Sequence, residues 1–279
     1  MSDRATSSCD LPYHLLAVDL DGTLLTSSKS ISSRTADVLR KVMARGVKVI
    51  IASARPPRSV KPYYDQLALD TWQINYNGAL VQHPSTRRIL IHRPMVSQLV
   101  EDVVDFARQC YPECIISLEV LDKWYTDRYE PSLQTETSKL FEPDAVGPLD
   151  QFLAEPVTKM VILGEEPLLR RLEDQLAEEF ATEITLTRSD QVCVQVMRAG
   201  LSKAIALAEV ARDYGISRQR VMAIGDAPND VGMLTYAAVG VAMANAHTSA
   251  KVAADRLTLS NDLDGVAVAV EEILLKKRI

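Results

Sequence analysis

The chain alternates between short apolar runs and segments in which apolar residues recur with helical spacing. Residues 15–18 (LLAV) and 47–52 (VKVIIA) are strand-like runs. Between them, Ser32 suits a helix N-cap, helical spacing continues through Met43, and Gly46 marks a helix end. This order predicts two parallel strands joined by a right-handed crossover, so that both strands end on the same edge of a sheet.

The same alternation returns near the C-terminus. Ser202 is suited to cap a helix that runs to about Arg212. Further strands are expected over residues 220–224, 238–243 and 256–259, before a helix that begins at Asp264. Such alternation is typical of an α/β fold with a doubly wound, Rossmann-like parallel sheet covered by helices.

The middle of the chain has a different pattern. Residues 79–92 resemble a hairpin, 95–111 an amphipathic helix, 114–120 a strand, and 129–156 a proline-rich stretch with weak patterning; a strand at 157–163, a helix at 167–180 and strands at 182–188 and 192–197 follow. A length of 279 residues also favours two domains. We therefore predict an α/β core domain of residues 1–83 and 191–279, with an α+β cap domain of residues 84–190 inserted into it.

Composition narrows the classes of function. With 47% hydrophobic and 24% charged residues the chain is ordinary globular material, and a formal charge of -6 argues against a nucleic-acid-binding face. No apolar run approaches the roughly 20 residues of a membrane helix, and the N-terminus has no apolar signal region. We expect a cytoplasmic protein without nucleic-acid or membrane partners, whose oligomeric state the sequence leaves unknown. The cysteines lack metal-ligand spacing and are expected to be reduced thiols: Cys9, Cys110, Cys114 and Cys193.

Carboxylates follow two of the predicted strands. Asp19 and Asp21 come after the first strand, and Asp226 follows residues 220–224. In such sheets, ligands bind outside the carboxyl ends of the strands. An EF-hand loop would need glycine and glutamate where this chain has Leu24 and Ser30, so calcium binding of that kind is excluded.

A plain solvated turn at residues 19–22 would leave the second acidic cluster unexplained. If Asp19, Asp21 and Asp226 converge, their repulsion calls for a divalent cation, and Mg²⁺ suits oxygen ligands. Mg²⁺ beside a carboxylate indicates phosphoryl transfer, with Asp19 as nucleophile and Asp21 as general acid and base. Gly22 would allow a tight turn and a close approach of the backbone to a ligand.

Phosphoryl transfer also needs donors for the phosphate oxygens. Ser53 follows the second strand, and the backbone N–H groups of Ala54 and Arg55 add to its hydroxyl. Taken alone, Ser53 would be an ordinary strand-end serine. Lys203 lies in the first turn of a helix against the helix dipole, which indicates a nearby anion, although a surface lysine is an equally good interpretation of this residue alone.

Together these residues resemble a known family. The segments DLDGTL (19–24), Ser53 after an apolar strand, Lys203 in GLSKAIAL and GDAPND (225–230) resemble the four motifs of the haloacid dehalogenase (HAD) superfamily, in their usual order. NGA (77–79), GVAMANA (240–246) and SNDLDGVA (260–267) resemble the Cof-type branch, whose members carry a type II α/β cap between the second and third motifs. The predicted insertion has the place and size of such a cap.

The resemblance implies a HAD-like core and a role for each matching residue. Asp19 would be the nucleophile, Asp21 the general acid and base, Ser53 and Lys203 ligands of the phosphate, and Asp226 a ligand of Mg²⁺ together with Asp19 and the backbone carbonyl of Asp21. Asn229 would lie near the phosphate, Asp230 would support the metal or Lys203, and Asn77 would help to hold the transferred group. Ala54 departs from the family, which usually has glycine there; we expect this change to be tolerated.

The predicted function is a Mg²⁺-dependent phosphatase that hydrolyses a small phosphorylated metabolite, either a sugar phosphate or a phosphorylated cofactor, through an aspartyl-phosphate. A phosphomutase and a non-catalytic regulator that binds a phosphorylated ligand are the alternatives. Substrate choice is expected to depend on the cap, where polar and aromatic residues cluster at Lys123, Trp124, Tyr125, Arg128 and Tyr129. A hairpin face that packs its own aromatic residues is the simpler interpretation of each; our hypothesis is that at least one lines the leaving-group pocket.

Overall fold

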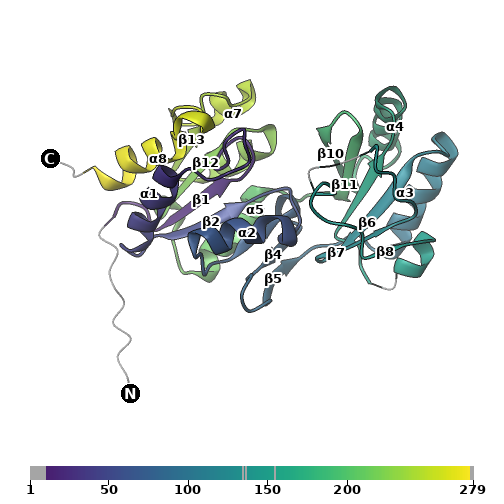
Figure 1. Cartoon of the computed structure of the whole chain (residues 1–279), viewed down its shortest axis with the longest axis horizontal. Coiled ribbons are helices and arrows are strands. Elements are labelled where there is room, and N and C mark those ends of the chain that lie inside the picture. The colour runs from purple at the N-terminus through teal and green to yellow at the C-terminus, as the bar shows by residue number, and fades with distance from the viewer. Residues whose placement is uncertain (1–10, 134, 136, 154, 277–279) are drawn as a thin grey trace, which may run out of the picture. The chain divides into compact units, whose positions relative to one another are not determined.

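The structure is a computed structural model that describes residues 11–133, 135, 137–153 and 155–276 (Figure 1). The chain forms two compact units. The first comprises the described parts of Met1–Ser53, Val60–Leu90 and Ser202–Ile279, and the second comprises those of Ala54–Ser59 and Ile91–Leu201.

The first unit is built on an eight-stranded sheet with the order β14-β13-β12-β1-β2-β3-β4-β5. Its strands are β1 (Leu15–Asp19), β2 (Lys48–Ala52), β3 (Gln73–Asn75), β4 (Leu80–Gln82), β5 (Ile89–His92), β12 (Val221–Gly225), β13 (Val239–Ala242) and β14 (Arg256–Leu257). The pairs from β14 to β3 are parallel, and β4 is antiparallel to β3. All five residues of β1 are buried, as expected for the central strand of a parallel sheet covered on both faces.

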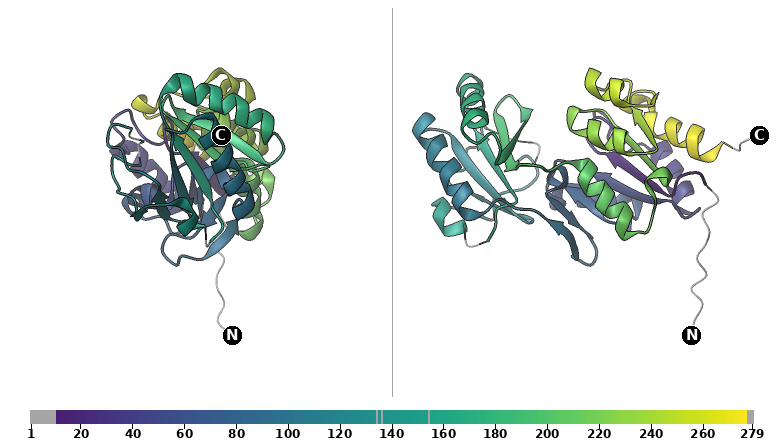
Figure 2. Two further views of the ribbon diagram at one scale, coloured as in Figure 1. Left: turned by 90° about the vertical axis from the view of Figure 1, so that its right-hand side faces the viewer. Right: turned by 180° about the vertical axis from the view of Figure 1, so that it is seen from behind.

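Helices alternate with these strands and form two groups. They are α1 (Ser33–Met43), α2 (Pro57–Leu67), α5 (Lys203–Asp213), α6 (Val231–Tyr236), α7 (Thr248–Ala253) and α8 (Gly265–Val270), with short turns η1 (Tyr76–Gly78), η3 (Arg218–Arg220), η4 (Pro228–Asp230), η5 (Asn261–Leu263) and η6 (Glu271–Leu275). α1 packs with α8, whereas α5, α6 and α7 pack in succession (Figure 2). Ser32 caps α1 by accepting a hydrogen bond from the Thr35 N–H at 3.1 Å, as the sequence predicts.

The order of the strands places three chain segments at one edge of the sheet. β1 lies between β12 and β2, with Leu15 beside Val221 on one side and Lys48 on the other. The chain leaves β1 in one direction and later returns on its other side, which makes this a topological switch point. The residues that follow β1, β2 and β12 therefore lie at the edge where α/β proteins bind ligands.

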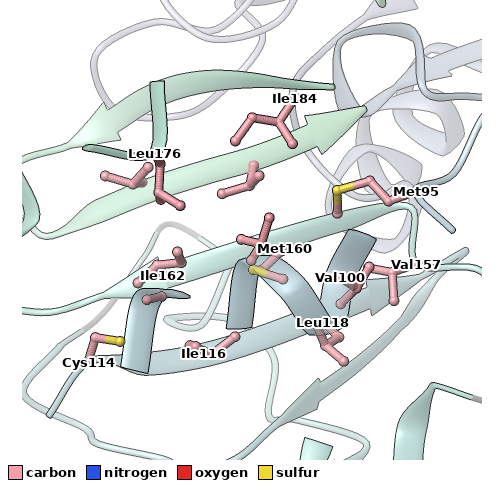
Figure 3. Close-up of a cluster of buried hydrophobic side chains, with 14 of the residues drawn as sticks. Met95, Val100, Cys114, Ile116, Leu118, Val157, Met160, Ile162, Leu176 and Ile184 are labelled. Atoms are coloured by element: carbon pink, nitrogen blue, oxygen red, sulfur yellow. The ribbon is translucent and has the colours of Figure 1, made fainter. Parts of the chain in front are cut away.

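The second unit contains a six-stranded sheet with the order β10-β11-β9-β6-β7-β8. Its elements are β6 (Ile115–Val120), β7 (Lys123–Thr126), β8 (Ala145–Val146), β9 (Lys159–Leu163), β10 (Ile184–Asp190), β11 (Cys193–Arg198), α3 (Ser97–Cys110), α4 (Glu166–Glu179) and the turn η2 (Leu149–Phe152). Alternate residues of β6 and β9, such as Ile116, Leu118, Met160 and Ile162, join a buried cluster with Val100 of α3 and Leu176 of α4 (Figure 3).

The predicted α/β class, with a doubly wound core and an inserted α+β region, is confirmed. Two strands, β5 and β11, belong to a different sheet from the one to which the predicted boundaries at 83/84 and 190/191 would assign them. β5 joins the eight-stranded sheet next to β4, and β11 joins the six-stranded sheet as the antiparallel partner of β10. Each hairpin keeps its two strands in one sheet, which apolar spacing alone does not reveal. The division into separate domains, a core of residues 1–83 and 191–279 and a cap of residues 84–190, stays a prediction.

In the part of the chain that the structure describes, no helix has the length and apolar character required to cross a membrane. Cys110, Cys114 and Cys193 are free thiols, as predicted. The fourth cysteine, Cys9, lies outside the described residues.

Candidate active site

Three carboxylates gather at the switch point. Asp19 is the last residue of β1, Asp226 directly follows β12, and Asp230 ends the turn η4. One carboxylate oxygen of each lies within 4.8 Å of the others. Glycine at position 225 allows this approach, because a Cβ there would lie 2.6 Å from the Cβ of Asp230.

Lys203 joins two of these carboxylates. It is the first residue of α5 and its side chain is 1% exposed. Its Nζ donates to Asp19 Oδ1 at 2.5 Å and to Asp230 Oδ1 at 2.7 Å. The anion that the sequence predicts beside this lysine therefore includes the protein's own carboxylates.

Both carboxylate oxygens of Asp230 accept hydrogen bonds. Its second oxygen, Oδ2, accepts hydrogen bonds from the backbone N–H groups of Asp226 at 3.0 Å and Ala227 at 2.9 Å. Because both carboxylate oxygens already have donors, the geometry favours a supporting role for Asp230, which orients Lys203 and the turn that carries Asp226.

The electrostatics of the cluster favour a bound cation. Burial raises the pKa of Asp19 well above its usual range, and the charge of Asp230 adds to this effect. Burial likewise raises the pKa of Asp226, against a hydrogen bond from Thr23. Burial lowers the pKa of Lys203, but Asp19 and Asp230 outweigh it, so the pKa lies above its ordinary value and the side chain is an ammonium ion. With all three carboxylates ionised, the cluster has two negative charges in excess of the ammonium.

The donor set fits a hard divalent cation. Carboxylate oxygens are the ligands that Mg²⁺ takes in proteins, and a double positive charge would balance the excess. Asp19 and Asp226 are the members of the group best suited to coordinate it. The structure thus supports an acidic site that is compatible with a divalent metal ion.

The Asp21 side chain lies outside this carboxylate group. It is 38% exposed, and its Oδ1 accepts a hydrogen bond from Lys29 Nζ at 2.8 Å. The carboxylates that come together are therefore those of Asp19, Asp226 and Asp230. A half-exposed carboxylate such as that of Asp21 is suited to exchange protons with substrate and water.

The segment after β1 reaches Asp226 through Gly22 and Thr23. Gly22 has φ +75°, and a Cβ at this position would overlap the Asp226 carboxylate. Thr23 Oγ1 donates to Asp226 Oδ1 at 2.9 Å. No role for Thr23 is predicted from the sequence. The available signal was a hydroxyl residue directly before two leucines, since a buried hydroxyl needs a hydrogen-bond partner, and Thr23 is buried in the structure.

The segment after β2 contributes neutral polar groups. Ser53 is buried, its N–H donates to Ile74 O at 2.9 Å, and its carbonyl accepts from the Asn77 N–H at 3.1 Å. Asn77 adopts a left-handed conformation, with φ 53° and ψ 25°. Its Oδ1 accepts from Asn229 Nδ2 at 2.8 Å, so two asparagines that are 152 positions apart lie together beside the turn η4.

Ala54, which stands where the resemblance leads us to expect glycine, shows no backbone strain. It is not among the described non-glycine residues with positive φ. The conformation after Ser53 is therefore one that alanine adopts without a penalty.

Comparison with known proteins agrees with this geometry. A family model for haloacid dehalogenase-like hydrolases matches residues 16–270. The chain belongs to this family. The resemblance of its motifs to the Cof-type branch of the HAD superfamily is thereby confirmed.

Relatives of this HAD hydrolase are named as phosphatases. The 5-amino-6-(5-phospho-D-ribitylamino)uracil phosphatase YitU of Bacillus subtilis (strain 168) is 33% identical over 264 residues, which cover 94% of this chain and 97% of that protein. The putative phosphatase YxeH of the same strain is 29% identical, with 95% and 100% coverage. A crystal structure of a haloacid dehalogenase-like hydrolase from Bacteroides thetaiotaomicron matches with a TM-score of 0.84 at 30% identity, covering 94% and 99% of the two chains. The predicted enzyme class, a HAD-type phosphatase, is confirmed.

Proposed function

We propose that this HAD phosphatase hydrolyses a small phosphorylated metabolite, with Mg²⁺ as cofactor and Asp19 as the nucleophile. The observation that carries the proposal is the buried contact of Asp19 with Lys203, beside Asp226 at the switch point of the sheet. A carboxylate held by a fixed ammonium at a metal-compatible edge is arranged to attack phosphorus.

The residues around Asp19 have distinct tasks in this proposal. Asp19, Asp226 and the backbone carbonyl of Asp21 would hold Mg²⁺, which would supply positive charge to the phosphate. Lys203 favours the ionised form of Asp19, although burial and Asp230 outweigh this effect, and its ammonium is available to a phosphate oxygen. Asp230 keeps Lys203 in place. Burial and the charge of Asp230 keep the pKa of Asp19 raised even with Lys203 in place, so the charge of a bound cation would be needed to hold this carboxylate ionised as a nucleophile.

Two transfers complete the hydrolysis. An oxygen of Asp19 forms a bond to phosphorus while the bond from phosphorus to the leaving oxygen breaks, and Asp21 gives its proton to that oxygen. Water then attacks the phosphorus of the aspartyl-phosphate, Asp21 takes the water proton, and the bond between phosphorus and Asp19 breaks to release phosphate. The half-exposed position of Asp21 supports this exchange of protons.

The phosphate oxygens need donors that do not react. We assign this task to Ser53, the backbone N–H of Ala54, Asn77 and Asn229, together with Lys203. The hydrogen bond between Asn229 and Asn77 supports the assignment, because it fixes both amides beside the acidic cluster. Fixed donors stabilise the transition state without reorganising during the reaction.

A pocket in the second unit is a candidate for recognising the rest of the substrate. Trp124, Arg128 and Tyr129 line it, and the Trp124 and Tyr129 rings meet edge to face with centroids 6.1 Å apart. Tyr125 instead stacks on Phe152, with centroids 4.7 Å apart. We propose that the three lining residues contribute to substrate choice, whereas Tyr125 stabilises the fold.

Substitutions test this assignment. Trp124→Ala and Arg128→Ala are expected to lower kcat/KM for the preferred metabolite while leaving that for p-nitrophenyl phosphate nearly unchanged, because this small substrate makes few contacts beyond its phosphate. Lys123→Ala is the control, since Lys123 is 63% exposed and pairs with Asp144. Unchanged kcat/KM for every substrate in both pocket variants would contradict the proposal.

The decisive experiment measures phosphate release from a substrate panel, with Mg²⁺ and with chelator. The panel contains sugar phosphates, pyridoxal phosphate and, because the YitU relative is named for it, 5-amino-6-(5-phospho-D-ribitylamino)uracil. Release that requires Mg²⁺ and is lost in Asp19→Asn would support the proposal. Transfer of phosphate to another oxygen of the same sugar would indicate a phosphomutase, and binding without turnover would indicate a regulator. The cytoplasmic location and the absence of other partners stay predictions.

A further inference from the structure

Two sequence segments noted above have no part in the proposed chemistry. GVAMANA (240–246) covers the end of β13 and the residues after it, and SNDLDGVA (260–267) follows β14, yet neither segment supplies a member of the acidic cluster. Three of their side chains instead make hydrogen bonds to the loop that carries Asp21. These residues, Asn245, Asn261 and Asp262, are called the clamp below.

Asn245 binds the backbone next to Asp21. Its Nδ2 donates to the Gly22 carbonyl at 2.8 Å, and its Oδ1 accepts from the Asn261 N–H at 3.1 Å. A carboxamide is suited to this position because it offers a donor and an acceptor on one short side chain. An aspartate would have no donor and would place a negative oxygen against a carbonyl oxygen.

Asn261 holds the loop three residues farther along. It is the first residue of the turn η5, and its Nδ2 donates to the Leu25 carbonyl at 2.9 Å. The two asparagines thus bind carbonyls on both sides of Thr23 and Leu24. Both acceptors are backbone atoms, so the contacts fix the path of the chain.

Asp262 holds the turn that follows. Its Oδ1 accepts from the Ser27 N–H at 2.7 Å and its Oδ2 from Ser27 Oγ at 2.6 Å. The same turn is closed by a hydrogen bond from the Thr26 N–H to Ser30 O at 3.0 Å, and it carries Lys29, which donates to Asp21 at 2.8 Å. The clamp therefore binds the loop beside Asp21. It also binds the turn that carries Lys29, whose ammonium group contacts Asp21.

Asp21 needs such external support. It lies beyond the end of β1, its side chain is half-exposed, and it is followed by a glycine with φ +75°. We propose that Asn245 and Asn261 are positioning residues, which set the location of the Asp21 carboxylate by holding the carbonyls of Gly22 and Leu25, with Asp262 assisting through Ser27. This inference rests on the proposed role of Asp21 as general acid.

The leaving group of the substrate provides a specific test. An alkyl phosphate needs a proton on its leaving oxygen, whereas p-nitrophenolate leaves readily without one. A displaced general acid therefore slows the first substrate far more than the second. General acid catalysis contributes about 10²–10⁴-fold, and a misplacement of about 1 Å removes roughly 10²-fold. We expect Asn245→Asp and Asn261→Asp to lower kcat/KM for the alkyl phosphate by about 10–100-fold, with a much smaller effect on p-nitrophenyl phosphate.

The experiment compares kcat/KM, which reports the steps up to departure of the leaving group, for p-nitrophenyl phosphate and for the best alkyl phosphate of the panel, at saturating Mg²⁺. Asp21→Asn is the reference for loss of the acid. Gln66→Glu is the matched control, because it makes the same amide-to-acid change on an exposed side chain of α2. Asp262→Ala, on the exposed turn, provides a second variant whose folding is not at risk; a smaller loss with the same leaving-group dependence is expected.

The possible results separate this inference from the proposed function. A selective loss on the alkyl phosphate in the clamp variants and in Asp21→Asn, with unchanged inhibition by inorganic phosphate and unchanged melting temperature, supports the clamp. A selective loss in Asp21→Asn alone, an equal loss on both substrates in the clamp variants, or a loss that more Mg²⁺ restores would overturn it. If Asp21→Asn itself shows no leaving-group dependence, the proposed role of Asp21 fails, and the inference fails with it.

Discussion

Lys203 shows how a buried charge is made tolerable by its neighbours. An ammonium that is 1% exposed would be strongly destabilising alone, but here Asp19 and Asp230 both accept its hydrogen bonds. Removing the lysine would leave two buried carboxylates facing each other. Its contribution to activity and to stability is therefore expected to be large.

Lys203→Met is expected to abolish most activity and to destabilise the protein. Loss of one fixed donor to a transition-state charge lowers kcat by about 10²–10³-fold. In chelator, the free energy of unfolding should fall by about 3–5 kcal/mol, because the partners of a buried pair remain uncompensated. Denaturant unfolding measures the second effect, and Lys41→Met, on the exposed side of α1, is the control. Unfolding free energies that match in both variants would contradict this account.

Replacing Ala54 with glycine is expected to change stability and activity only slightly. Because its φ is not positive, glycine at this position gains nothing in the folded state and adds freedom to the unfolded chain. Ala54→Gly should lower the unfolding free energy by about 0.4–1 kcal/mol and leave kcat/KM within the same order of magnitude. A many-fold rise in turnover would instead show that the alanine methyl crowds the bound phosphate.

At the scale of residues, the sequence predicts charged groups at strand ends better than hydrogen bonds to the backbone. Asp19 and Asp226 could be recognised because each follows an apolar run, and Lys203 because it opposes a helix dipole. The contact of Asn245 with the Gly22 carbonyl spans 223 positions and involves no charge or periodicity. Such a contact depends on tertiary structure, so composition and spacing gave no indication of it.

At the scale of elements, α5 brings Lys203 to the acidic cluster. The helix begins at Lys203 because Ser202 caps it, with Ser202 Oγ accepting from the Ile205 N–H at 3.2 Å. Buried residues on one face of the helix, including Leu207 and Val210, fix its position against the sheet. The start of the helix and the place of the lysine are therefore set by neighbouring residues.

Ser202→Ala is expected to destabilise the protein by about 1 kcal/mol, the usual effect of losing an N-cap serine. Activity should fall modestly, because the packed face of α5 still holds Lys203 near Asp19. Thermal unfolding and kcat measured on the same samples test both statements. Ser32→Ala provides the comparison, since Ser32 caps α1, which carries no proposed catalytic residue. If Ser202→Ala reduced kcat as strongly as Lys203→Met, Ser202 would have to be assigned a direct part in catalysis.

The sequence predicted the helices and strands of the first unit more reliably than their grouping. β1, α1, β2, α5 and β12 lie where apolar spacing and capping residues indicate. Within the weakly patterned residues 129–156, the described part contains only the two-residue strand β8 and the turn η2. Elements this short have too few residues for periodicity to show, and the sheet that a hairpin joins depends on contacts distant in sequence.

At the scale of the whole molecule, the acidic cluster is expected to couple folding to the proposed binding of Mg²⁺. A ligand that binds only the folded protein stabilises it by mass action, by about 2.7 kcal/mol at 100 times its Kd. With its carboxylates ionised, the cluster contributes two of the negative charges that make up the formal net charge of -6. Mg²⁺ should therefore raise the melting temperature more than an equal ionic strength of NaCl does.

This stabilisation is expected to grow with pH. Burial raises the folded-state pKa values of Asp19 and Asp226 above those in the unfolded chain, which lie near about 4. Between the unfolded and the raised folded values the folded protein binds more protons, so in chelator the contribution of these groups to stability falls as pH rises. Mg²⁺ must displace the same protons, and its effect is smallest at the acid end of this window. Melting curves from pH 5 to pH 8, with Mg²⁺ and with chelator, test the prediction. Asp19→Asn, which removes one of the carboxylates, should flatten the dependence; a Mg²⁺ effect that is independent of pH and equal in the variant would place the metal elsewhere.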